Sequence, residues 1–162
     1  MPYLFGTDSE ETKIIESWWT VLSNNPGDRA GLRRCHELKE VYFQPTFHSL
    51  RLRLKGRIDN EKDAMPLATV VALMAHVKTN EKVFPLARQM ATPISGNKAR
   101  VSELRFRRLL QCQNHEELFP MLLRIIRMLD GWVHIPSLAH GAYYWGDRIR
   151  QDWAMKYYSP TP

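Results

Sequence analysis

Apolar residues recur at helical spacing along almost the whole of this 162-residue chain, and the alternation that β-strands require is nearly absent. One such stripe consists of Ile14, Ile15, Trp18, Trp19 and Leu22. Segments rich in Asn, Pro and Gly, such as 24–28 and 92–98, interrupt the pattern. The chain is therefore expected to fold as an all-α protein built from short helices.

Capping residues, helix breakers and apolar stripes together predict the positions of these helices. One helix starts within 7–11 and runs through 22, and the others cover 28–35, 46–55, 66–77, 85–90, 102–112, 115–129 and two stretches within 137–158. Residues 92–98 provide the best linker candidate. We therefore predict two small helical bundles packed together, 1–92 and 99–162, joined by a short linker at 93–98.

Positive charge is concentrated in two blocks of the sequence. The net charge is +6, yet residues 29–57 carry eight basic groups against two acids, and residues 83–108 carry six against one. The stretches 58–82 and 109–162 are close to neutral, and residues 1–28 are acidic. This distribution favours an acidic polymer as a partner, whereas the alternative is a basic surface that serves solubility.

Arginines are threaded between the apolar positions of the helical segments, most clearly within 102–112. At 100° per residue, the apolar positions of this segment lie on one face. Arg108 falls nearly opposite that face, while Arg105 and Arg107 flank it. Three exposed guanidinium groups can bind successive phosphates, and the alternative is an ordinary solvated helix face.

Two further helical segments show the same arrangement. Arg29 and Arg33 share a face one turn apart with Arg34 beside them, and repulsion between like charges favours an anion over them. Arg148 points away from the apolar stripe near the end of the chain. Arg150 lies at the edge of that stripe, where packing or a salt bridge is as good an interpretation as nucleic-acid contact.

No set of acids, nucleophiles or metal ligands accompanies these basic segments. The histidines are scattered, and Cys35 and Cys112 lie far apart without a partner at metal-binding spacing. Both cysteines are expected to be buried free thiols. We predict a binding protein that is not an enzyme and has no metal and no cofactor.

The sequence indicates a cytoplasmic protein without a membrane partner. Acids at positions 8, 10 and 11 do not fit a signal peptide, and the uncharged run from 64 to 77 is too short to span a bilayer. Tryptophans 18, 19, 145 and 153 continue the apolar stripes, so core packing is favoured over a base-stacking platform.

Four motifs together are similar to one known family. They are Ala30-x-Leu32-Arg33-Arg34, Leu86-Ala87-Arg88, Ser102-Glu103-x-Arg105-Phe106-x-x-Leu109-Leu110 and Trp145-Gly146-x-Arg148-x-Arg150-Gln151. In this order and spacing, the chain resembles the small subunit of type I-E CRISPR Cascade complexes, the CasB family. Ala87 stands where the family commonly has Gly.

The resemblance implies an all-helical, non-catalytic subunit of a prokaryotic Cascade complex, usually present twice. Its implied partners are the guide RNA, the target and displaced DNA strands, the other Cascade subunits and a second copy of itself. By their place in the motifs, Arg33, Arg34, Arg105, Arg148 and Arg150 would contact nucleic acid. The whole candidate set from residues and resemblance is Arg29, Arg33, Arg34, Lys98, Arg100, Arg105, Arg107, Arg108, Arg148 and Arg150.

Two other functions are compatible with parts of the sequence. A freestanding helical nucleic-acid-binding regulator would need a recognition helix and would show sequence preference. A helical enzyme would need a pocket that gathers acids or histidines with perturbed pKa values. Base pairing reads sequence in an RNA-guided system while the protein contacts backbone, so two basic blocks without a base-reading motif favour the Cascade subunit.

Overall fold

Helices make up most of the computed structural model, which describes residues 5–6, 8–58 and 61–159. The elements are α1 (Glu10–Ser23), α2 (Pro26–Arg33), α3 (Leu38–Val41), α4 (Pro45–Arg53), α5 (Ala64–Met74), β1 (Thr79–Asn80), α6 (Leu86–Ala91), α7 (Glu103–Leu110), α8 (His115–Met128), β2 (Trp132–Val133), α9 (Ile135–Tyr143) and α10 (Asp147–Tyr157). The predicted all-α fold class is confirmed.

Side-chain caps start the helices near where the sequence indicates. Ser9 accepts a hydrogen bond from the Thr12 amide at 3.1 Å, while Thr7 lies outside the described residues. The helix expected to begin at Asp28 instead begins at Pro26, because Asn25 is its N-cap and Pro suits the first helical turn. Asp28 thus lies in the first turn and is not the cap.

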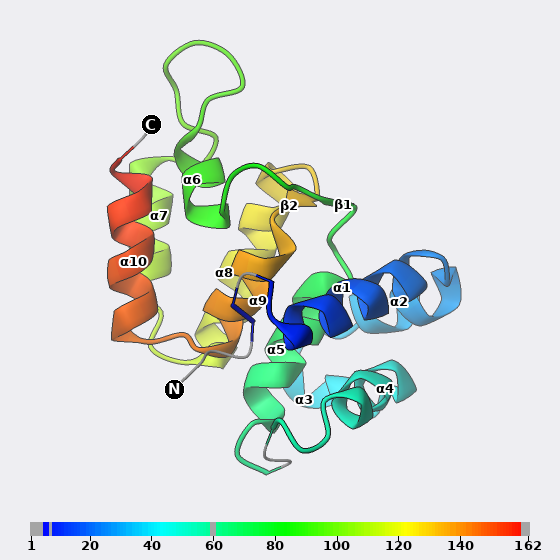
Figure 1. Ribbon diagram of the computed structural model, residues 1–162. Helices are drawn as coiled ribbons and strands as arrows, with labels where there is room; N and C mark the ends of the chain where they lie inside the picture. Colours follow the sequence, from blue (N-terminus) through cyan, green and yellow to red (C-terminus); the bar gives the residue numbers. More distant parts are fainter. Residues whose placement is uncertain (1–4, 7, 59–60, 160–162) are drawn as a thin grey trace.

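Helix α5 is the centre of the fold (Figure 1). Every residue from 67 to 75 is buried, so this helix is apolar on all sides and needs partners all around it. It packs against α3, α2 and α4 from the first part of the chain and against α8 and α9 from the second. The buried cluster therefore includes residues from both parts.

Two connections across the fold were not expected from the sequence. Thr79–Asn80 pairs in parallel with Trp132–Val133, and α6 packs against α10. The Asn80 side chain also donates to Glu16 at 2.6 Å and accepts from the Ile135 amide at 3.1 Å. Segments of the predicted units 1–92 and 99–162 thus interlock, and the division between the two units stays a prediction.

The predicted linker forms a loop that projects from the molecule between α6 and α7 (Figure 1). Its two ends meet, because the Val101 amide donates to the Met90 carbonyl at 2.9 Å. The side chains from Ile94 to Lys98 are exposed. The segment therefore leaves the body of the protein and returns to the same place.

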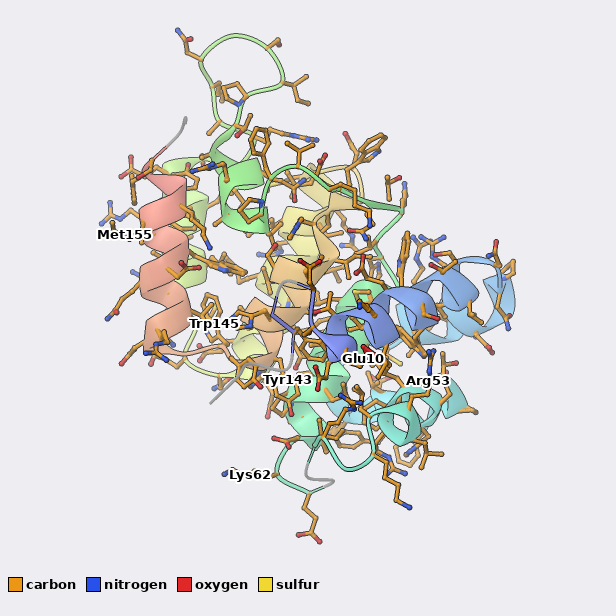
Figure 2. All side chains as sticks on the ribbon, in the orientation of Figure 1. Glu10, Arg53, Lys62, Tyr143, Trp145 and Met155 are labelled. Carbon is orange, nitrogen blue, oxygen red and sulfur yellow. The ribbon has the colours of Figure 1, made fainter. Side chains whose placement is uncertain are left out.

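The expected burial of the tryptophans is confirmed for Trp18 and Trp153. Trp19 and Trp145 are half-buried, and their indole N–H groups donate to the Val77 and Cys112 carbonyls at 3.1 and 2.8 Å. Figure 2 shows Trp145 between the adjacent ends of α9 and α10. No helix in the described ranges is both long and apolar enough to cross a membrane.

Candidate nucleic-acid interface

A basic hollow lies where α5 and α8 end. It measures about 440 Å³ and is lined by Arg33, His76, Lys78, Ile126, Arg127, Asp130 and Gly131. We refer to these seven residues as the basic hollow. It combines one residue of the first basic block with residues that follow or end two other helices.

The backbone turn at Gly131 shapes one wall of the hollow. Gly131 has a φ of +77°, which glycine adopts without strain, and its carbonyl accepts hydrogen bonds from the amides of Lys78 at 2.8 Å and Thr79 at 3.1 Å. A Cβ at position 131 would lie 2.7 Å from Cγ of Lys78. The lysine side chain is therefore seated directly against the glycine.

Arginines from α2 cap the C-terminal end of α5. The Nε–H groups of Arg29 and Arg33 both donate to the Ala75 carbonyl at 3.0 Å, and Arg29 also donates to the Val77 carbonyl at 3.2 Å. Cations are favourable at this end of a helix, where the last carbonyls lack partners. The sequence predicted that Arg29 and Arg33 would share an anion. In the structure they share the Ala75 carbonyl, and this contact offsets part of the repulsion between the two guanidinium groups.

Positive charge in the hollow is nevertheless largely uncompensated. The side chains of Lys78 and Arg127 are exposed and make no hydrogen bond or ion pair with the described part of the chain, and the Arg33 side chain donates through its Nε alone. The one acid, Asp130, lies 3.6 Å from Nη2 of Arg100. Three cations therefore face a hollow whose carboxylate is already paired.

The pKa of His76 reports on this environment. Burial lowers it, and the neighbouring charges of Arg33, Arg127 and Arg29 lower it further, to about 4. The imidazole is therefore neutral near pH 7. A neutral imidazole can still donate a hydrogen bond to an anion.

The predicted arginine row on α7 is present on the surface. Arg105, Arg107 and Arg108 are all exposed, and their side chains make no hydrogen bond or ion pair with the residues described. Arg100 precedes this helix and donates to the Met128 carbonyl at 3.3 Å, so the start of α7 lies beside the end of α8. Arg100 of the second basic block thereby lies next to the hollow.

Two candidates from α10 lie elsewhere. Arg150 is largely enclosed: it pairs with Asp147 at 2.9 Å, donates to the Cys112 carbonyl and lies over the Trp145 ring at 5.6 Å. These contacts support the packing and salt-bridge interpretation of Arg150. Arg148 is exposed and lines a separate cleft between α9 and α10.

The remaining candidates are exposed at separate places. Arg34 forms the C-cap of α2, and Lys98 lies in the projecting loop. The structure thus brings Arg29, Arg33 and Arg100 toward the hollow. It does not bring Lys98, Arg148 or Arg150 there.

Sequence reasoning missed His76, Lys78 and Arg127. They lie in stretches whose net charge is near zero, so the charge blocks gave no indication of them. The available signal was their place directly after or at the end of apolar helices, where cations are favoured.

The cysteines and the possible metal ligands of the described residues do not form a second candidate site. Among residues 5–6, 8–58 and 61–159, no three His, Cys, Asp or Glu side chains gather closely enough to hold a metal ion. Cys35 and Cys112 are buried and free, and burial raises the pKa of both thiols, so neither is an activated nucleophile.

Comparison with known proteins identifies the family. The family model of the CRISPR-associated protein Cse2 matches residues 28–158. The chain belongs to the CRISPR-associated Cse2 family. The resemblance to the Cascade small-subunit family that the sequence motifs indicated is thereby confirmed.

A solved structure has the same fold. One chain in the crystal structure of E. coli Cascade bound to a PAM-containing double-stranded DNA target matches this Cse2-family chain with a TM-score of 0.72 and 20% identity. The match covers 90% of this chain and 95% of that chain. Among curated proteins, no sequence matches.

Proposed function

We propose that this Cse2-family chain is a non-catalytic small subunit of a Cascade complex that stabilises the R-loop through backbone contacts. Its nucleic-acid partners are the guide RNA–target DNA heteroduplex and the displaced strand, and its protein partners are other Cascade subunits and a second copy of itself. The family match and the fold shared with a chain of DNA-bound E. coli Cascade support this proposal.

The basic hollow is the observation that carries the proposal. Arg33, Lys78 and Arg127 converge on it without an unpaired acid. Such a site suits a phosphate, which carries charge and acceptor oxygens but no sequence information. Because the α7 arginines lie on the adjoining helix, a strand that leaves the hollow can meet further cations.

A few contacts with phosphate groups are sufficient to stabilise an R-loop. Exchange of a DNA duplex for an RNA–DNA heteroduplex is nearly balanced in free energy. A few phosphate contacts made in the open state can therefore shift the equilibrium without any base-reading element. Family membership weighs against the alternative of a freestanding nucleic-acid-binding regulator.

The decisive experiment removes two cations of the hollow that have no partner in the described chain. Lys78→Ala/Arg127→Ala should weaken strand opening by the reconstituted complex by about tenfold, because each lost phosphate contact weakens the open state. Stability should change little, since neither side chain makes a hydrogen bond here.

The matched control removes two positive charges elsewhere. Lys13 is exposed on α1, and Lys39 is exposed on α3, where it pairs with Glu37 at 3.5 Å. Lys13→Ala/Lys39→Ala should leave strand opening unchanged. Equal losses in both variants would mean that net charge alone acts, and no loss in either would refute a role for the hollow.

A further inference from the structure

A second and larger cavity lies between α9 and α10, with the start of α6 at one end. It measures about 580 Å³, within the range of roughly 300–1,000 Å³ that is typical of small-molecule sites. The proposed contact with the nucleic-acid backbone at the basic hollow makes no use of it. We refer to it as the α9–α10 cleft.

The cleft has a rigid floor. A Cβ at Gly141 would overlap the indole ring of Trp153, lying 2.9 Å from Cε2, so only glycine allows α9 to approach α10 this closely. At the rim, the Leu86 amide donates to Oγ of Ser137 at 2.8 Å, which fixes the start of α6 to α9. The cleft is therefore formed before any ligand arrives.

His134 is fixed within this rim. Its backbone amide donates to Oε1 of Gln89 at 3.0 Å, and its Nδ1 accepts from the Ser137 amide at 3.2 Å. Because Nδ1 is an acceptor, Nε2 carries the proton. Burial lowers the pKa of His134, so the ring is a neutral hydrogen-bond donor near pH 7.

The lining combines rings with positive charge. His134 and His140 contribute two half-buried rings, and the almost fully buried rings of Phe5 and Trp153 form part of the floor. Arg148 and Lys156 contribute two positive charges against one negative charge from Asp152, which lies 2.8 Å from Lys156. Rings with an excess of positive charge are the chemistry with which proteins bind nucleotides, through stacking and phosphate contact.

We propose that the α9–α10 cleft binds a nucleotide, with its base against the His134 and His140 rings and its phosphate at the Arg148 and Lys156 rim. The nucleotide is either free or an unstacked nucleotide of a single strand. In the second case the proposal rests on the proposed function, because the strand would come from the open complex.

The proposal can be tested on the isolated full chain by calorimetry and by amide chemical shifts. AMP should bind with shifts at the start of α9 and along α10, and it should bind about tenfold or more tightly than adenosine or inorganic phosphate. Equal affinity for inorganic phosphate would reduce the cleft to an anion site and overturn the proposal. An absence of shifts there with AMP and with a short oligoadenylate would also overturn it.

Tighter binding of the oligoadenylate than of AMP would show that the bound nucleotide belongs to a single strand. Tighter binding of AMP would show that the ligand is a free nucleotide. Either result supports a nucleotide site. In both cases, the shifts must lie at the cleft.

Two variants make the test specific. His134→Asn keeps an oxygen that can cap α9 but removes the ring, and Arg148→Ala removes the rim charge. Each should weaken AMP binding by about tenfold while Arg124→Ala, an exposed arginine on α8, leaves it unchanged. Equal affinities in all three variants would refute the site.

Failure here is distinguishable from failure of the proposed function. Lys78→Ala/Arg127→Ala should retain AMP binding, since neither residue lines the cleft. A chain that loses R-loop stabilisation in that variant but never binds AMP would support the proposed function and refute the nucleotide site.

Discussion

Arg33 donates its Nε–H to the Ala75 carbonyl at 3.0 Å, and so joins the end of α2 to the end of α5. Arg29 makes the same contact from one turn earlier. A guanidinium can cap a helix with one N–H and still offer others to a ligand. The same side chain can therefore serve folding and binding, and variants must separate the two roles.

Stability measurements should reveal the capping role. Arg29→Ala/Arg33→Ala is expected to lower the free energy of unfolding by roughly 1–3 kcal/mol, because the carbonyls at the end of α5 lose charged donors. Urea denaturation followed by circular dichroism measures this change. Arg105→Ala/Arg107→Ala, which removes exposed and unpaired charges, should have almost no effect; equal losses would contradict the capping role.

The α7 row should determine the salt dependence of binding. The isolated protein is expected to bind single-stranded nucleic acid weakly, with steep salt dependence and little sequence preference. Replacing Arg105, Arg107 and Arg108 with alanine should reduce the slope of log K against log salt by about 2, at roughly 0.7 per lost contact. Fluorescence anisotropy over a salt series tests this. Sequence-selective affinity that persists at high salt would favour the regulator instead.

Stability should fall in mild acid because of His76. Its pKa drops from the ordinary histidine value of 6.5 to about 4 in the fold, so the unfolded chain binds a proton that the folded chain does not. The stability contributed by neutral His76 is present above pH 6.5 and is lost as the pH falls toward 4, by about 1–2 kcal/mol after allowance for partial exposure.

Urea denaturation at a series of pH values, with wild type and His76→Asn, isolates this effect. Burial also lowers the pKa values of His134 and His140, so the variant should keep part of the acid sensitivity. The same pH dependence in both proteins would show that His76 makes no contribution.

Close packing at Gly141 should make it intolerant of a methyl group. Gly141→Ala is expected to cost about 1–3 kcal/mol of stability and to change tryptophan fluorescence, because the Trp153 indole must shift. Gly27→Ala is the control, since a Cβ there meets nothing closer than Oδ1 of Asn25 at 3.8 Å. Thermal unfolding of both variants distinguishes a packing effect from a general cost of losing a glycine.

Proteolysis tests how the predicted units 1–92 and 99–162 behave. A cut within the exposed segment 94–98 should leave the two fragments associated, because α6 packs against α10 and β1 pairs with β2. Size-exclusion chromatography after cleavage should show one species at the mass of the intact chain. Separation into two stable fragments would instead show that the units are independent.

Much of the fold could be predicted because its helices carry local signals. Ser102 and the apolar stripe that follows it predict a helix that the structure places at Glu103–Leu110. Helix α3 is only four residues long, which is too short for a helical repeat of apolar residues to be recognised in the sequence. The pairing of β1 with β2 joins residues more than fifty positions apart, and two-residue strands carry no alternation.

The candidate site was only partly predictable for a different reason. Composition locates arginines along the chain but not their partners. The helical pattern places Arg150 at the edge of the apolar stripe and leaves packing and nucleic-acid contact open, and only the fold encloses it against Trp145. Lys78 and Arg127 each stand alone in the sequence and converge only because α5 and α8 end side by side. Convergence of this kind is a tertiary property.

Shape and charge in the basic hollow are set by different atoms. Its outline comes from backbone: the ends of two helices and the left-handed turn at Gly131. Its potential comes from the tips of long side chains that rest on that backbone. Single substitutions of these side chains can therefore change the charge of the hollow one unit at a time while its shape stays the same. The affinity for a phosphate can thus be adjusted without a change in the backbone.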